Sequence, residues 1–139
     1  MTKFKAGKYY IGDLCYVIPY EPVDEWEEFC NLTMDEDTGK CLDGEFPWKG
    51  GKLWCNRTFY GDGVYNDQDD HQYGVDAGLI GCIPFELCTE RNETKMKRLG
   101  RVVEFDKPFT CAYNEGVFKI GHILIDTSFE NEELEEEPL

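Results

Sequence analysis

Hydrophobic and polar residues alternate in short runs along this chain, a pattern that predicts strands more than helices. The clearest run covers residues 52–60, where Leu53, Cys55, Arg57 and Phe59 alternate with a second set of residues. Neither set is purely polar, so we expect a strand that is covered on both faces or has an aromatic-rich exposed face. Further strand-like runs lie at residues 8–11, 14–18, 73–76, 79–83, 101–105, 109–113 and 117–126.

One segment has helical spacing instead. Pro22 suits the first position of a helix, and Val23, Trp26 and Phe29 then fall near one face of a helix over residues 23–32. Acidic residues follow Pro22 closely, which favours a helix start because the helix N-terminus carries partial positive charge. The sequence therefore predicts one short helix near residues 23–32.

These elements together predict a mainly β (α+β) fold. Turn signals separate seven or eight strands, whereas residues 33–51 have no period and predict a loop. This arrangement favours a small antiparallel barrel or sandwich. The length of 139 residues suits a single β-rich domain over residues 1–129. Residues 130–139 contain six glutamates and no base, which predicts an acidic disordered tail.

The net charge of −15 restricts the partners that we expect. Residues 21–45 alone hold ten acids and one base, Lys40. Such a surface repels nucleic acids and anionic membranes, and it favours a basic partner protein or simply keeps the chain soluble. No apolar run approaches the roughly 20 residues of a membrane span, and the first ten residues do not resemble a secretory signal. We therefore expect a cytoplasmic protein.

Seven cysteines are present, and none forms a Cys-x2-Cys pair. We expect most of them to be free, buried thiols and expect no zinc site. Cys15 is a nucleophile only if a base such as His71 or His122 lies beside it in space. The chain has no phosphate loop and no common hydrolase or kinase motif, so we expect no cofactor and favour a non-enzymatic protein.

Three aspartates lie beside glycines, in Gly12-Asp13, Gly61-Asp62-Gly63 and Asp76-Ala77-Gly78. Such pairs form tight turns, because glycine adopts positive φ and aspartate bonds the turn backbone. They also gather carboxylates if the turns meet at one end of the fold, where they serve acid–base chemistry or hold a divalent metal. We expect Asp13 and Asp62 to shape turns and leave both interpretations open for Asp76.

The loop over residues 66–71 is a second candidate metal site, with Asp67, Asp69 and Asp70 as oxygen ligands for calcium. It lacks the EF-hand order of glycine and glutamate, so a solvated hairpin tip is the favoured interpretation. The alternative to a metal site is a binding surface of tyrosines among acids. Its candidate residues are Asp13, Tyr16, Tyr60, Asp62, Tyr65, Asp76, Asp35, Glu36 and Asp37.

The segments Gly12-Asp13-Leu14-Cys15-Tyr16, Tyr60-Gly61-Asp62-Gly63-Val64-Tyr65 and Val75-Asp76-Ala77-Gly78-Leu79-Ile80-Gly81 carry a resemblance. They resemble a group of small accessory proteins of tailed bacteriophages, over roughly residues 6–84 and the last hairpin. Those proteins have proline where this chain has Leu14, which leaves the turn less rigid here. The resemblance implies a non-virion protein made inside an infected bacterium, where such proteins bind host machinery, including defence systems.

The first functional hypothesis is therefore a phage-encoded accessory protein that binds and modulates a basic host protein through an acidic, tyrosine-rich face. The alternative is a metal-dependent hydrolase, or a small-ligand or nucleotide-binding protein, that uses Asp13, Asp62 and Asp76. A minor assembly factor is the second alternative. The sequence does not indicate an oligomeric state.

Overall fold

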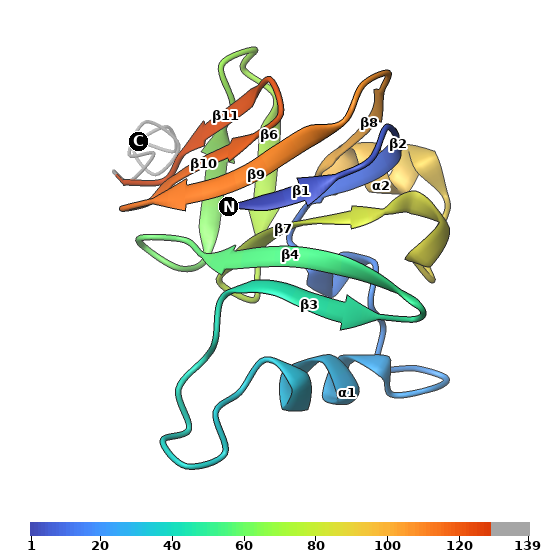
Figure 1. Cartoon of the computed structure of the whole chain (residues 1–139), viewed down its shortest axis with the longest axis vertical. Helices are drawn as coiled ribbons and strands as arrows, with labels where there is room; N and C mark the ends of the chain where they lie inside the picture. The colour runs from blue at the N-terminus through green and yellow to red at the C-terminus, as the bar shows by residue number, and fades with distance from the viewer. Residues whose placement is uncertain (129–139) are drawn as a thin grey trace, which may run out of the picture.

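Two antiparallel sheets and a hairpin make up the β-structure of residues 1–128, the part of the chain that the computed structural model describes (Figure 1). The terminal sheet has the order β1 (Thr2–Phe4), β9 (Phe109–Asn114), β10 (Val117–Ile120), β11 (Ile123–Asp126). The central sheet has the order β3 (Gly44–Trp48), β4 (Gly51–Arg57), β7 (Leu79–Pro84), β2 (Gly7–Gly12), β8 (Arg101–Phe105). The hairpin pairs β5 (Gly63–Asn66) with β6 (Gln72–Val75). The mainly β prediction is confirmed, as a sandwich-like arrangement without a closed barrel in this part of the chain.

The central sheet has a hydrophobic core on each face. Successive side chains of a strand point in opposite directions, so a strand of this sheet can contribute to both cores. On β2, Tyr9 and Ile11 enter the first core, and Tyr10 enters the second. On β4, Trp54 belongs to the first core and Leu53 to the second. The expectation of two covered faces for the clearest strand is therefore confirmed, and it explains why neither set of its residues is purely polar.

The first core fills the space between the two sheets and the hairpin. Phe105 and Phe109 stack there with ring centroids 3.7 Å apart, and Trp54 meets Phe118 edge-on at 6.0 Å. The hairpin contributes Tyr73, which has no exposed area. These aromatic contacts bury large apolar surfaces and add specific ring geometry, so they fix how the sheets stack.

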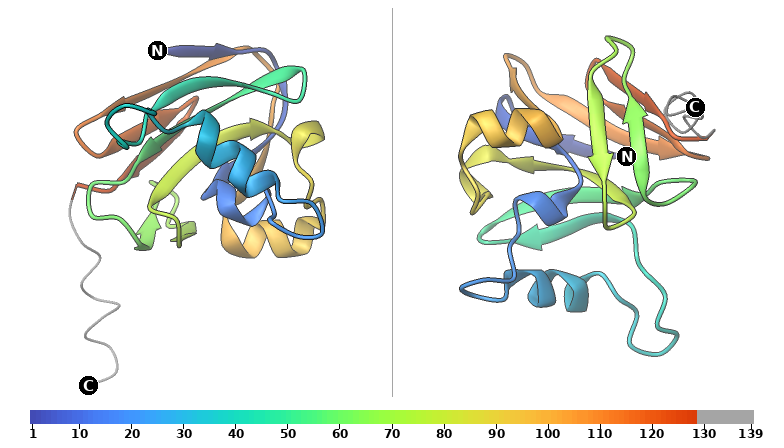
Figure 2. Two further views of the ribbon diagram at one scale, coloured as in Figure 1. Left: turned by 90° about the horizontal axis from the view of Figure 1, so that it is seen from below. Right: turned by 180° about the vertical axis from the view of Figure 1, so that it is seen from behind.

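The second core lies on the other face of the central sheet, under helix α1 (Glu25–Leu32). Figure 2 shows α1 and the terminal sheet on opposite sides of the central sheet. Phe29 is buried between Trp26, with ring centroids 4.9 Å apart, and Trp48 at 6.1 Å. The helix starts two residues later than predicted because the Asp24 side chain accepts the Glu27 N–H and so caps the first turn.

Two segments differ from the sequence prediction. The predicted strand at residues 14–18 is instead a 3₁₀ turn, η1 (Leu14–Tyr16), because Asp13 caps its start through the Cys15 N–H. Residues 44–48, predicted to be part of a loop, form the edge strand β3. Pro47 is tolerated there because an edge strand leaves one row of N–H groups unpaired.

A second helix, α2 (Glu93–Leu99), was not predicted. Asn92 caps it by accepting the Lys95 N–H, Met96 is its buried residue, and its last turn is basic. These are standard start and stop signals, so the sequence contained them, but seven residues give too few turns for a clear apolar period. A 3₁₀ turn, η2 (Phe85–Leu87), follows Pro84.

The boundary at residue 129 and the predicted tail over residues 130–139 lie outside the described residues. Within residues 1–128, the two cores share the central sheet and form one continuous body. In this part of the chain no helix has the length and apolar character needed to cross a bilayer.

All seven cysteines are free, and their burial predicts how fast they react. Burial raises the pKa of the Cys55 and Cys88 thiols to about 12, which keeps them protonated at neutral pH. We expect a maleimide reagent to label exposed Cys41 rapidly in the native protein, while buried Cys55, Cys82, Cys88 and Cys111 react only after unfolding. Rapid labelling of all seven native thiols, measured by mass spectrometry, contradicts this expectation.

Candidate functional site

Asp13 sits in a buried corner where three chain segments meet. Its side chain has no exposed area. One carboxylate oxygen accepts the Cys15 N–H at 3.0 Å, and the other accepts the N–H groups of Asp76 and Ala77 at 2.8 and 2.6 Å. Asp13 therefore caps η1 and, at the same time, holds the turn between β6 and β7 against it.

Glycines make this corner possible by allowing close backbone approach. A Cβ atom at Gly81 would lie 2.6 Å from the Trp54 carbonyl oxygen and 2.8 Å from Leu14. Gly12 has a φ of 154°, which side-chain-bearing residues rarely adopt. These positions let η1 rest directly on the central sheet, and they account physically for the Gly-Asp and Leu-Ile-Gly segments of the sequence.

The other two Gly-flanked aspartates lie near this corner but face solvent. Asp76 is exposed and accepts the Tyr16 hydroxyl at 2.6 Å. Asp62 is exposed too, and a Cβ atom at Gly78 would lie 3.7 Å from its Oδ1. Among residues 1–128, no group of three or more His, Cys, Asp or Glu side chains is arranged to hold a metal ion. The fold brings the three motifs together without directing their carboxylates to one point.

The electrostatics of the corner disfavour nucleophilic chemistry. Burial raises the pKa of the Asp13 carboxyl, and the three N–H donors oppose that rise. Burial, and then the Asp13 charge, raise the pKa of the Cys15 thiol far above its usual range. A thiol that stays protonated at neutral pH is a poor nucleophile. His71, a base considered for it, instead bonds the Gly100 carbonyl oxygen at 2.5 Å.

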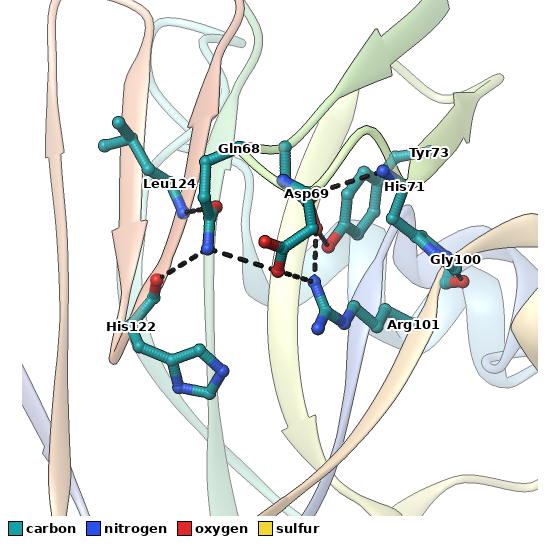
Figure 3. Close-up of polar contacts among 9 residues, drawn as sticks. Gln68, Asp69, His71, Tyr73, Gly100, Arg101, His122 and Leu124 are labelled. Carbon is teal, nitrogen blue, oxygen red and sulfur yellow. Dashed lines mark hydrogen bonds and ion pairs between the residues drawn. The ribbon is translucent and has the colours of Figure 1, made fainter.

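Asp67 is the centre of a second polar cluster, whose neighbours are shown in Figure 3. Its side chain has no exposed area, and its two oxygens accept four hydrogen bonds. Oδ1 accepts the N–H groups of Asp69 and His71 at 2.8 and 3.0 Å, and Oδ2 accepts the Tyr73 hydroxyl at 2.7 Å and Arg101 at 2.6 Å. The loop that seemed a solvated hairpin tip therefore contains a buried, fully bonded carboxylate.

This cluster fastens the β5–β6 hairpin to the rest of the fold. Gln68 accepts the Leu124 N–H at 2.8 Å and donates to the His122 carbonyl at 2.9 Å, which ties the loop to β11. Arg101, at the start of β8, ties it to the central sheet. Asp69 remains 55% exposed, and Asp70 occupies a positive-φ turn position. Both oxygens of Asp67 accept hydrogen bonds from the protein itself, so this polar cluster serves to join the hairpin to the neighbouring strands.

Residues 19–43, here named the α1 arm, carry most of their acidic side chains on an exposed surface. Glu36 and Asp37 are exposed, and Asp35 is partly exposed while it accepts the N–H groups of Asp37 and Thr38 at 2.8 and 3.2 Å. The arm extends below the sheets in Figure 1. Its loop is closed by backbone hydrogen bonds, among them Leu42 N–H to the Thr33 carbonyl at 2.7 Å.

The α1 arm also exposes apolar side chains that the sequence interpretation did not single out. They are Tyr20 (69% exposed), Val23 (66%), Met34 (44%) and Leu42 (41%). Large exposed apolar side chains within an acidic segment are typical of a contact surface, where they act as anchors. The sequence gives only a weak indication of this exposure. These apolar residues stand in a charged run and together fit neither a helical nor a strand period.

The predicted tyrosines divide between surface and core. Tyr60 is 48% exposed and meets exposed Phe59 edge-on, with ring centroids 4.9 Å apart. Tyr65 is only 3% exposed and donates its hydroxyl to the Gly61 carbonyl at 2.9 Å, so it belongs to the first core. Tyr16 is partly exposed beside Asp76. A continuous face that includes Asp13 and Tyr65 is therefore incompatible with the structure, because both side chains are buried.

The exposed candidates for function are thus the α1 arm and the smaller Phe59–Tyr60 pair, whereas Asp13 and Asp67 hold the fold together. In comparisons with protein-family models, curated proteins and solved structures, the chain has no significant match.

Proposed function

We propose that this chain is a non-enzymatic binding protein whose α1 arm recognises a basic surface on a partner protein. The observation that carries the proposal is the coincidence of charge and exposed apolar area on one segment. The α1 arm, residues 19–43, holds nine acids against one base, Lys40, and it also exposes Tyr20, Val23, Met34 and Leu42. Acids steer a basic partner towards the arm, and desolvated apolar anchors then supply affinity.

The arm is held in place before any partner binds. Phe29 anchors α1 in the second core, and the Glu25 carboxylate lies 3.0 Å from Lys49 Nζ and accepts the Thr89 hydroxyl at 2.7 Å. A pre-organised surface loses less conformational entropy on binding than a loose one. The fold therefore presents the arm as a fixed shape.

The resemblance to accessory proteins of tailed phages suggests the setting of this function. In that setting the partner is a host protein with a basic site, and a defence protein is one such class. Hydrolysis by Asp13, Asp62 and Asp76 has less support, because both oxygens of Asp13 are occupied by backbone donors. An assembly factor would use the same surface to bind a phage protein. The identity of the captured partner therefore distinguishes an assembly factor from a protein that binds a host protein.

Affinity capture from infected or expressing cells, followed by mass spectrometry, tests the proposal. We expect the wild-type chain to capture a protein of net positive charge. A variant with Asp35→Asn, Glu36→Gln and Asp37→Asn is expected to bind that protein about tenfold more weakly at low salt, mainly through slower association. Tyr20→Ala is expected to weaken binding at least as much through faster dissociation.

A matched control removes three acids elsewhere, with Glu104→Gln, Asp106→Asn and Glu115→Gln, all at exposed positions. This control is expected to keep most of the affinity, because its charges lie outside the arm. Equal losses in both triple variants would show that only the overall charge matters. A captured acidic partner, or binding that Tyr20→Ala leaves unchanged, contradicts the proposed surface.

A further inference from the structure

A cleft of about 500 Å³ collects basic side chains in this otherwise acidic molecule. Among residues 1–128 its charged lining consists of Lys3, Lys5, Lys49 and Lys52, with Glu86 as the one acid. Four of the chain's 14 basic residues thus meet in one cleft, although acids outnumber bases 29 to 14 in the chain as a whole. Random placement of the basic residues does not favour such a cluster.

Two segments far apart in sequence build the lysine cleft. Phe4 on β1 is buried at 4% exposure, so its neighbours Lys3 and Lys5 are exposed. Lys49 begins the two-residue turn between β3 and β4, and Lys52 follows on β4. The corner that leads from β1 to β2 and the β3–β4 turn lie on the same side of the molecule, at the right of Figure 1.

The turn that carries Lys49 holds an unusual residue. Lys49 has a φ of 47° and Gly50 a φ of 82°, which are the values of a type I′ turn. Asparagine or glycine is the favoured residue at such a first position, whereas a longer side chain there is uncommon. The same backbone geometry recurs at Glu115 and Gly116, with φ values of 47° and 92°, so it fixes the course of the turn, and the case for a site rests on the charges of the cleft.

The lysines are available to a ligand. Among residues 1–128, Lys3 and Lys5 form no ion pair. Lys49 pairs with Glu25 at 3.0 Å and donates to the Thr89 hydroxyl at 2.9 Å, so its charge adds to the cleft while its bonds hold α1 in place. Lys52 lies 3.7 Å from Glu45 in an exposed pair, which contributes little to stability and exchanges readily for a stronger anion.

We propose that the lysine cleft binds a small molecule that carries two or more phosphate groups. Four lysines and one glutamate give the lining a charge of 4 − 1 = +3. Two phosphate groups carry roughly −3 to −4 at neutral pH, which matches this charge. Lysine ammonium groups bind phosphate as point charges, and the volume lies within the roughly 300–1,000 Å³ of small-molecule sites.

The size of the ligand follows from the charge of the whole molecule. A nucleic acid strand must extend beyond the cleft onto a surface of net charge −15, which repels it. A small phosphorylated molecule fits inside and senses mainly the local lysines, because exposed charges farther than about 8–10 Å are screened at physiological salt. The cleft therefore selects compact polyanions.

Isothermal titration calorimetry of the full chain at low salt tests the proposal with three probes: inorganic tripolyphosphate, ATP and adenosine. We expect the first two to bind and adenosine not to bind. Equal affinities for tripolyphosphate and ATP assign recognition to the phosphates alone, and tighter ATP binding adds a contact with the nucleoside. Failure of both phosphorylated probes to bind at millimolar concentration overturns the proposal.

Paired variants locate the binding. The variant Lys3→Gln, Lys5→Gln is expected to weaken tripolyphosphate binding at least tenfold, since it removes two unpaired charges of the cleft. The control Lys107→Gln, Lys119→Gln removes two exposed lysines outside it and is expected to change affinity less than twofold. Thermal melting confirms that both variants fold. An equal loss in the two variants shows binding to general surface charge and refutes the site.

Discussion

Replacing Asp67 by alanine is expected to lower the free energy of unfolding by about 3–5 kcal/mol, the range for breaking a buried ion pair from one side. The substitution leaves Arg101 without its closest acid and the buried Tyr73 hydroxyl without its acceptor. It also removes the acceptor of two N–H groups in the loop. The hairpin then loses its shortest bond to β8 and keeps only the longer Asp69–Arg101 contact at 3.3 Å among the ion pairs of residues 1–128 that join them. Urea unfolding monitored by circular dichroism measures the loss.

Three further variants show whether the effect comes from the buried bonds. Asp69→Asn changes a carboxylate that is 55% exposed and 3.3 Å from Arg101, so we expect a loss below about 1 kcal/mol. Tyr73→Phe removes one bond to Asp67 and should cost about 1–2 kcal/mol. Tyr10→Phe should be nearly neutral, since the buried Tyr10 hydroxyl has no hydrogen-bond partner within residues 1–128. Equal costs for the two tyrosine variants contradict this account.

The pH dependence of stability gives an independent check on Asp67. Burial acts to raise the pKa of this carboxyl, but the hydrogen bonds from Tyr73, the loop N–H groups and Arg101 outweigh it, so the pKa in the folded state is lowered. Stability from a lowered pKa is complete above the unfolded value of about 3.9 and is lost as the pH falls through the folded value. The stability difference between wild type and Asp67→Asn should therefore shrink below about pH 4.

Replacing Asp13 by alanine is expected to cost about 2–4 kcal/mol, because three N–H groups in a partly buried corner lose their acceptor. The same change frees the β6–β7 turn from η1. Replacing Asp13 by asparagine preserves only part of this stability. The two oxygens of Asp13 accept bonds from different segments, and an amide has only one oxygen, so Asp13→Asn is expected to cost about half as much.

If Asp13 only formed a turn, Asp13→Asn would be a mild change, because asparagine also bonds a turn backbone. The loss of stability expected here is larger than that. Asp62→Asn provides the comparison, since Asp62 is exposed and should tolerate the change within about 0.5 kcal/mol. Unfolding curves for the three variants, recorded at pH 7, decide between the two accounts. An Asp13→Asn variant as stable as Asp62→Asn would show that the bonds to residues 76–77 contribute little.

The local sequence pattern correctly predicted strands that have an apolar core on each face. The run at residues 79–83 reads as a strand because Ile80 and Cys82 enter the first core while Leu79 and Ile83 enter the second. The segment at Leu14 reads as a strand for the same reason, yet it forms η1. The Asp13 cap on the Cys15 N–H is local, but the bonds from residues 76–77 that hold Asp13 in this corner come from more than 60 positions away, and no local pattern contains them.

The candidate sites show the same limit. Asp67 looks like any aspartate of a polar loop, and its burial depends on Arg101, which is 34 positions later in the chain. The acidic character of the α1 arm was evident from composition, because charge is a property of the segment itself. The lysine cleft was not, since residues 3–5 and 49–52 come together only when the sheets form.

The position of the first strands has a consequence for biosynthesis. Strand β2 lies inside the central sheet between β7 and β8, and β1 pairs with β9. The N-terminal residues therefore leave the ribosome long before their partners at residues 79–114 exist. Pairing between distant segments slows folding and leaves apolar strands exposed meanwhile. Nascent chains that end before residue 101 should remain sensitive to protease, and productive folding should begin only once residues 101–114 have left the ribosome.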